Sequence, residues 1–176
     1  MEALEQGTER RPRSRRSLVL LLIGLLGIGV LVAGGLYADA RWRANAAVSL
    51  TIAFDKTVSA IEIAERRVQS VSEYARPARG RADLDPSVRE SLDALVRDAA
   101  IESSAVITER RAAVDDVLLL PWHSDLRHAQ TQAGVWLDLR ATGINSFAAQ
   151  GEARYPPRGE LNDARAALVR AFSTLN

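Results

Sequence analysis

Residues 17–38 form an apolar segment without any charged side chain. An α-helix rises about 1.5 Å per residue and crosses the ~30 Å hydrocarbon core of a bilayer in about 20 residues, so this segment is long enough to span a membrane. Five arginines precede it: Arg10, Arg11, Arg13, Arg15 and Arg16. Because arginines resist translocation, the cluster predicts a single-pass protein of the plasma (inner) membrane, with a cytoplasmic N-terminus and an extracytoplasmic C-terminus.

The same region has a second interpretation as a cleaved export signal. Residues 14–18 (SRRSL) look like a twin-arginine signal, and residues 38–40 (ADA) fit the small-x-small pattern of a cleavage site. The apolar run is longer than the roughly 7–15 residues of a signal core, and Trp42 suits an interfacial anchor. A retained signal-anchor is therefore the preferred prediction, while cleavage after Ala40 stays open.

The composition after residue 38 limits the possible functions. This part holds 18 basic and 19 acidic residues, a net charge of −1, so it lacks the basic stripe that nucleic-acid binding requires. The chain has no cysteine, which excludes thiol chemistry, c-type haem attachment and lipidation through an N-terminal cysteine. Lys56 is the single lysine among 23 basic residues, a bias typical of GC-rich bacterial genomes.

The apolar pattern predicts three parts: a disordered basic cytoplasmic tail at 1–16, a transmembrane helix at 17–38 and a helical domain at 39–176. Between Asp39 and Ala75 the chain contains neither Gly nor Pro, so we expect the membrane helix to continue outward until Pro77 ends it. Its coiled-coil-like seam has heptad spacing. The seam residues are Ala47, Phe54, Ile61, Val68 and Ala75, with Leu50, Thr57, Ala64 and Val71.

Three further helices are expected after the loop at 77–86. The second begins at Pro86, is capped by Asp85 and runs to Leu120, before Pro121. Its stripe is Leu92, Ala99, Val106, Ala113 and Leu120, flanked by Val88, Leu95 and Val117. The third is capped by Ser124 or Asp125. Its stripe is Leu126, Ala129, Ala133, Trp136, Ile144 and Phe147, and a short final helix carries Leu161, Ala164, Leu168, Phe172 and Leu175.

No segment alternates with a period of two residues, so the predicted fold is all-α. Similar helix lengths joined by short loops predict an extracytoplasmic antiparallel bundle of three long helices and one short helix. The turn at 120–123 then returns to the membrane surface, where Tyr37, Trp42 and Trp122 form an aromatic belt. The expected core residues are Phe54, Ile61, Val106 and Leu126.

The sequence gives little support to catalysis or metal binding. Asp125 and His128 have the i, i+3 spacing of di-iron bundles, but such a site needs a second pair and two glutamates. His123 lies five residues from His128, on the opposite face of a helix. No nucleophile elbow, Walker loop, dinucleotide fingerprint or zinc-peptidase motif occurs. We therefore expect a protein that is not an enzyme and uses no cofactor.

Four polar residues interrupt the apolar stripes of the second and third helices: Glu102, Ser103, Arg110 and Arg140. Polar groups inside a bundle must be paired. These residues either line a ligand pocket or lie at the edge of the seam and fix the register of the helices, and the second interpretation is preferred.

The predicted architecture is similar to the external four-helix sensor domains of bacterial transmembrane receptors, whose first membrane helix also continues into the bundle. Those receptors return through the membrane to a cytoplasmic output domain, whereas the final helix here is too polar to span. We therefore expect an accessory or scaffold protein that contacts the lipid bilayer and either a protein partner in the envelope or further copies of itself. A ligand-binding subunit of a sensor is the second hypothesis, and a metal-binding bundle is the third.

Overall fold

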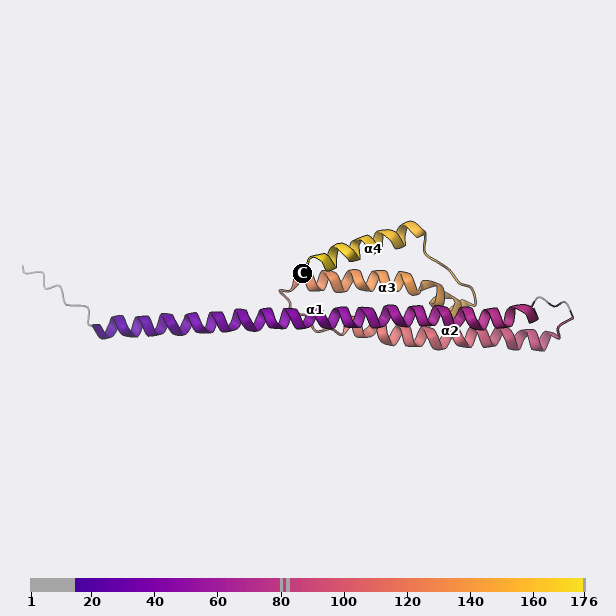
Figure 1. Cartoon of the computed structure of the whole chain (residues 1–176), viewed down its shortest axis with the longest axis horizontal. Coiled ribbons are helices and arrows are strands. Elements are labelled where there is room, and N and C mark those ends of the chain that lie inside the picture. The colour runs from indigo at the N-terminus through magenta and orange to yellow at the C-terminus, as the bar shows by residue number, and fades with distance from the viewer. Residues whose placement is uncertain (1–14, 80, 82, 176) are drawn as a thin grey trace, which may run out of the picture. The chain divides into compact units, whose positions relative to one another are not determined.

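All described secondary structure is α-helical in the computed structural model, which describes residues 15–79, 81 and 83–175 (Figure 1). The helices are α1 (Arg15–Arg79), α2 (Pro86–Asp115), α3 (Ser124–Gln150) and α4 (Arg158–Ser173). No strand occurs within these residues, so the predicted all-α fold of three long helices and one short helix is confirmed. Most of the predicted N-terminal tail, residues 1–14, lies outside the described residues.

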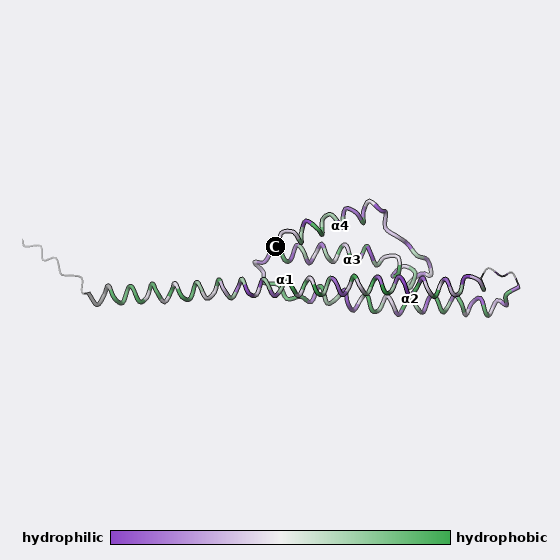
Figure 2. Tube along the Cα trace, in the orientation of Figure 1, coloured by the Kyte–Doolittle hydropathy of each residue, from purple (hydrophilic) through white to green (hydrophobic). Residues whose placement is uncertain are grey.

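The chain divides into two units, one ending at Trp42 and one beginning at Arg43. In the first unit, the large aliphatic side chains between Val19 and Leu36 are 52–77% exposed. Figure 2 shows this part of α1 as a run of hydrophobic residues. By length and composition, α1 is the one described helix that could cross a membrane.

In the second unit, α1 packs against the other three helices through the seam that the heptad spacing predicts. Leu50, Thr57, Ile61 and Ala64 are buried there, and no predicted seam residue is exposed. The ring of Phe54 lies 5.6 Å from that of Trp136 in α3 and 5.6 Å from that of Phe172 in α4. The predicted stripes of α3 and α4 are likewise buried or half-buried, with Leu126 and Ala129 fully so.

The loop between α1 and α2 differs slightly from the prediction. α1 continues through Pro77 and ends at Arg79, because a proline in the last turn removes only its own i→i−4 hydrogen bond. The predicted start of α2 is confirmed: Pro86 is its first residue, and Oδ1 of Asp85 accepts a 2.8 Å hydrogen bond from the backbone N–H of Ser87.

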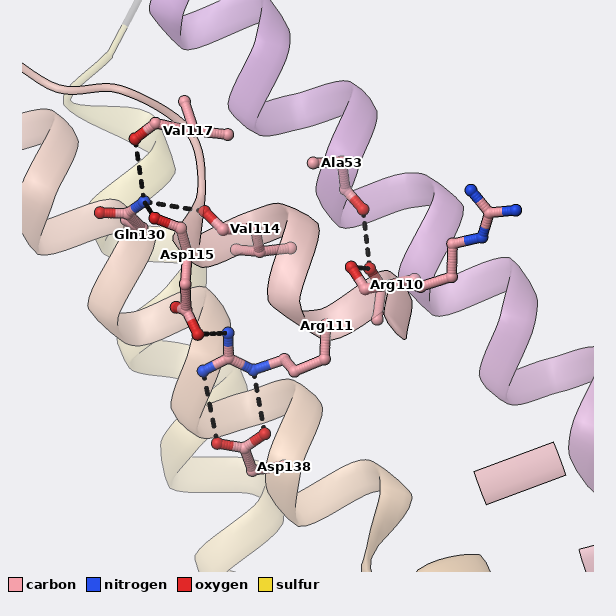
Figure 3. A network of polar contacts seen from close by, with 9 residues as sticks. Ala53, Arg110, Arg111, Val114, Asp115, Val117, Gln130 and Asp138 are labelled. Carbon is pink, nitrogen blue, oxygen red and sulfur yellow. Dashed lines mark hydrogen bonds and ion pairs between the residues drawn. The ribbon is translucent and has the colours of Figure 1, made fainter. Parts of the chain in front are cut away.

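α2 ends at Asp115, so the prediction that it reaches Leu120 is wrong. A side chain from α3 stabilises this helix end. The Nε2 of Gln130 lies 2.7 Å from the carbonyl oxygen of Val114, 3.0 Å from that of Asp115 and 3.3 Å from that of Val117 (Figure 3). The carbonyls of Val114 and Asp115 have no partner within a helix that ends here, and Gln130 satisfies them from outside.

The start of α3 also differs from the prediction. Its N-cap is His123, which makes no side-chain capping bond, so neither Ser124 nor Asp125 is the cap. Asp125 lies instead in the first turn, where its carboxylate forms an ion pair with Arg43 of α1. A negative charge in the first turn also interacts favourably with the helix dipole.

Of the four expected core residues, three pack into the core and one does not. Leu126 and Ile61 are buried and Phe54 packs against the core, but Val106 is 47% exposed. The buried face of α2 is instead Val96, Ala99, Ala100, Ser103, Ile107 and Val114. Neighbouring residues are about 100° apart around a helix, so a face centred on Ile107 leaves Val106 at its edge.

These two positions give a direct test of the register. Ile61→Ala should lower the free energy of unfolding by about 2–5 kcal/mol, because the side chain is 1% exposed and its removal leaves a cavity. Val106→Ala should cost less than about 1 kcal/mol, because Val106 is already half in solvent. Thermal unfolding of the full chain in mild detergent, followed by circular dichroism, measures both. An equal loss of unfolding free energy in the two variants would contradict the burial of Ile61 and the exposure of Val106.

Candidate functional site

The second unit has a hollow surface between α1 and α2. It comprises two adjoining hollows of about 600 and 320 Å³ that share Lys56 and Arg110, and we call it the α1–α2 groove. The α1 wall carries Ile52, Asp55, Lys56, Ser59, Ala60, Ile63 and Arg67. The α2 wall carries Ser103, Val106, Arg110 and Ala113, and Val117 in the turn after α2 completes it.

Apolar side chains in this groove remain in contact with solvent. Ile63 is 59% exposed, and Ile52 and Val106 are about half exposed. The two helices are held together beneath them by Thr57, which is fully buried and donates a hydrogen bond from Oγ1 to the carbonyl oxygen of Arg110 at 2.9 Å. The groove is therefore a surface of fixed helices rather than of mobile loops.

The cations of the groove differ in their pairing. Arg67 forms an ion pair with Glu102 across the two helices. Within the described residues, Lys56 and Arg110 take part in no ion pair. Figure 3 shows the guanidinium of Arg110 extending away from the other polar groups drawn there. The centre of the groove thus has two positive charges without an acidic partner.

The predicted polar cluster is only partly brought together. Ser103 and Arg110 line the same groove, and Glu102 lies beside it through its bond to Arg67. Arg140 is elsewhere: it forms a bidentate ion pair with Glu65 of α1, in which Nη2 and Oε2 are 2.8 Å apart. The described hydrogen bonds do not join the four residues into one network.

Arg140 and Glu65 line a separate hollow of about 480 Å³ between α1, α2, α3 and the loop before α4. The ring of Tyr155 lies directly over Gly143, where a Cβ atom would overlap the ring. This close approach explains a glycine inside α3, a position at which glycine costs roughly 1 kcal/mol relative to alanine.

A second arginine contact joins α2 to α3, and the sequence analysis missed it. Nε of Arg111 lies 2.9 Å from Oδ1 of Asp138, and its Nη1 lies 2.7 Å from Oδ2 of Asp115 (Figure 3). Partial burial by itself would lower the pKa of Arg111, but the two carboxylates outweigh it and raise that pKa. A Cβ at Gly134 would overlap this guanidinium. A glycine inside α3 was therefore the sequence feature that could have indicated a close contact at this point.

An apolar turn lies at the end of the second unit where Arg43 binds Asp125. Leu118 is 69% exposed and Trp122 is 66% exposed, and the indole of Trp122 meets the ring of His123 edge-on at 6.1 Å. The ion pair between Arg43 and Asp125 places the turn between α2 and α3 beside Arg43 rather than beside Pro77, as predicted. Figure 1 shows that this turn and the loop between α1 and α2 lie at opposite ends of α2.

The two histidines that border this turn do not share a site. His123 is buried, whereas His128 is exposed on α3. Within the described part of the chain, no group of three His, Asp or Glu side chains has a geometry that could hold a metal ion.

Comparisons of the chain with protein-family models, with curated proteins and with solved structures find no match.

The pair between Arg43 and Asp125 predicts a pH-dependent difference in stability. Partial desolvation would raise the pKa of Asp125, but the backbone N–H of Leu126 and the charge of Arg43 outweigh it and hold this pKa below 3.8. A depressed pKa stabilises the fold above the unfolded value and loses that effect as the pH falls through the folded value. The melting temperature of Asp125→Asn should therefore lie below that of the unsubstituted protein at neutral pH and converge with it in acid.

Arg43→Gln supplies the control for this measurement. In the Arg43→Gln protein, Asp125→Asn should lower the melting temperature less at neutral pH, because the positive charge that favours the carboxylate is gone. An unchanged effect would show that Asp125 acts through the helix terminus alone.

Proposed function

We propose that this protein is a single-pass membrane protein whose extracytoplasmic helical bundle is a non-catalytic scaffold for another component of the envelope. The observation that carries the proposal is the uncovered apolar stretch of α1 between Val19 and Leu36. Burying apolar surface is worth about 25 cal/mol per Å², so such a stretch requires a lipid environment or an equivalent cover.

The arginine cluster before this stretch supports a cytoplasmic N-terminus in the plasma (inner) membrane. The apolar turn supports the same arrangement. In the second unit, the turn exposes Leu118 and Trp122 to solvent. An exposed indole suits the headgroup region of a bilayer, so the turn, together with Tyr37 and Trp42, would contact the membrane surface.

The scaffold role is supported by how the polar groups of the bundle are used. The arginines at positions 43, 67, 111 and 140 each bind a carboxylate of another helix. These ion pairs hold the helices together. The α1–α2 groove, with its solvent-exposed aliphatic side chains, is a surface available to another molecule.

A second candidate, the ligand-binding subunit of a membrane sensor, is favoured by the hollow that contains Arg140. A small carboxylate or phosphate in this concave site would bind the Arg140 guanidinium in place of the Glu65 carboxylate. Native mass spectrometry of the full chain distinguishes the two candidates. A bound small acid that Arg140→Leu abolishes would favour the sensor subunit over the scaffold.

The topology is tested by enzyme fusion. Alkaline phosphatase, which is active only after export, should be active when fused after Asn176 and inactive when fused after Arg16. The apparent mass of the first fusion addresses cleavage, since loss of about 4 kDa would indicate removal of the segment through Ala40. An inactive fusion after Asn176 together with an active one after Arg16 would reverse the proposed orientation.

Contact between the turn and lipid is tested by fluorescence quenching. The chain has 3 tryptophans, so Trp42→Phe with Trp136→Phe leaves Trp122 as the single emitter. In bilayers of lipids brominated near the headgroup, Trp122 should be quenched because its indole reaches the interface. A variant that retains only Trp136, in the bundle, should be quenched much less. Equal quenching of the two would contradict the contact.

A further inference from the structure

We propose that the α1–α2 groove binds an acidic amphipathic helix of a partner protein. The apolar residues of that helix would fill the two hollows, and its carboxylates would meet Lys56 and Arg110. This inference rests on the proposed scaffold function and names the class of partner that the scaffold takes.

The first argument is that α2 has two apolar faces. Its inner face, which includes Val96, Ile107 and Val114, is buried against the other helices. Its outer face carries Val106 and Ala113, which line the groove. A helix that packs on one side needs one apolar stripe, so a second stripe in contact with solvent indicates a second packing partner.

The second argument is the shape of the groove. On α1 its lining residues extend from Ser49 to Arg67, about 27 Å along a helix, which matches five turns of a bound helix. The half-exposed residues Ile52 and Ile63 are three turns apart on one side of α1. A groove between two fixed helices with apolar side chains at this spacing is the surface that receives an amphipathic helix.

The third argument is the position of the charges. Lys56 and Arg110 line both hollows, so they lie at the junction between two apolar surfaces. Lys56, Arg67 and Arg110 outnumber Asp55 among the charged residues of the groove. Because Arg67 is already bound to Glu102, the available positive charge is concentrated at the centre. A carboxylate placed there would form charge-assisted hydrogen bonds partly shielded from water.

The same charges argue against a second copy of this chain as the occupant. A twofold dimer brings the same surface of each copy together. If a twofold axis passed through the centre of the groove, Lys56 and Arg110 of one copy would face the same two cations of the other. Like charges placed opposite one another disfavour association, so the occupant needs the opposite charge at this point.

The test is a selection with a displayed library of 18-residue amphipathic helices, in which the apolar positions are fixed and the flanking positions are randomised. The full chain in phosphatidylcholine nanodiscs is the target, and empty nanodiscs remove lipid binders. Selected helices should be enriched in Asp and Glu beside the apolar stripe. Their affinity should fall at least tenfold for the double variant Lys56→Glu, Arg110→Glu.

The matched control is Arg158→Glu with Arg165→Glu on α4, which changes the net charge equally outside the groove and should leave the affinity unchanged. Unfolding curves of both double variants check that the bundle is intact, and Lys56→Arg should retain binding. Loss of affinity in the groove variant alone supports the proposal. Absence of acidic enrichment, or equal loss in both double variants, overturns it.

Sedimentation of the full chain in detergent adds an independent outcome. A dimer that Ile63→Asp converts to a monomer would make a second copy the occupant and overturn the proposal. The phosphatase fusions report on membrane topology alone. The fusions could contradict the proposed membrane topology while the selection still yields acidic helices. In that case the proposed function would be wrong, and the proposal that the groove binds an acidic helix would be supported.

Discussion

The inner stripe of α1 is the surface on which the other three helices assemble. Phe54 contacts aromatic rings of both α3 and α4, while the buried hydroxyl of Thr57 binds the backbone of α2. The chain has no cysteine and therefore no disulfide to limit the unfolded state. The stability of the second unit depends on this packing. The packing in turn requires that α1 be uninterrupted, because one continuous stripe contacts all three other helices.

Much of this architecture could be predicted because α1 contains neither Gly nor Pro between Asp39 and Ala75, so one heptad pattern describes its whole inner face. The buried face of α2 was harder to predict for a physical reason. It has apolar residues on two faces, and periodicity alone does not tell which face is buried. The prediction that Val106 lies in the core was wrong because of that ambiguity: the structure buries the face with Ile107, and Val106 lines the groove.

The contacts between helices were less predictable than the helices themselves. With 22 arginines and one lysine, almost every helix offers a cation, and sequence spacing identifies only partners on the same helix. The pairs between Arg43 and Asp125, and between Arg140 and Glu65, join residues far apart in the chain. Such exposed or half-exposed pairs typically contribute about 0–1 kcal/mol each, so their main effect is to select one register among similar ones.

The amide of Gln130 links the folding of two helices. Because its donors satisfy the last carbonyls of α2, the final turn of α2 is complete only when α3 is docked against it. If α3 separates, those carbonyls return to water and the end of α2 frays. The C-terminal end of α2, the turn and the first half of α3 thus form one cooperative unit, whose amide protons would exchange with solvent through a common opening event.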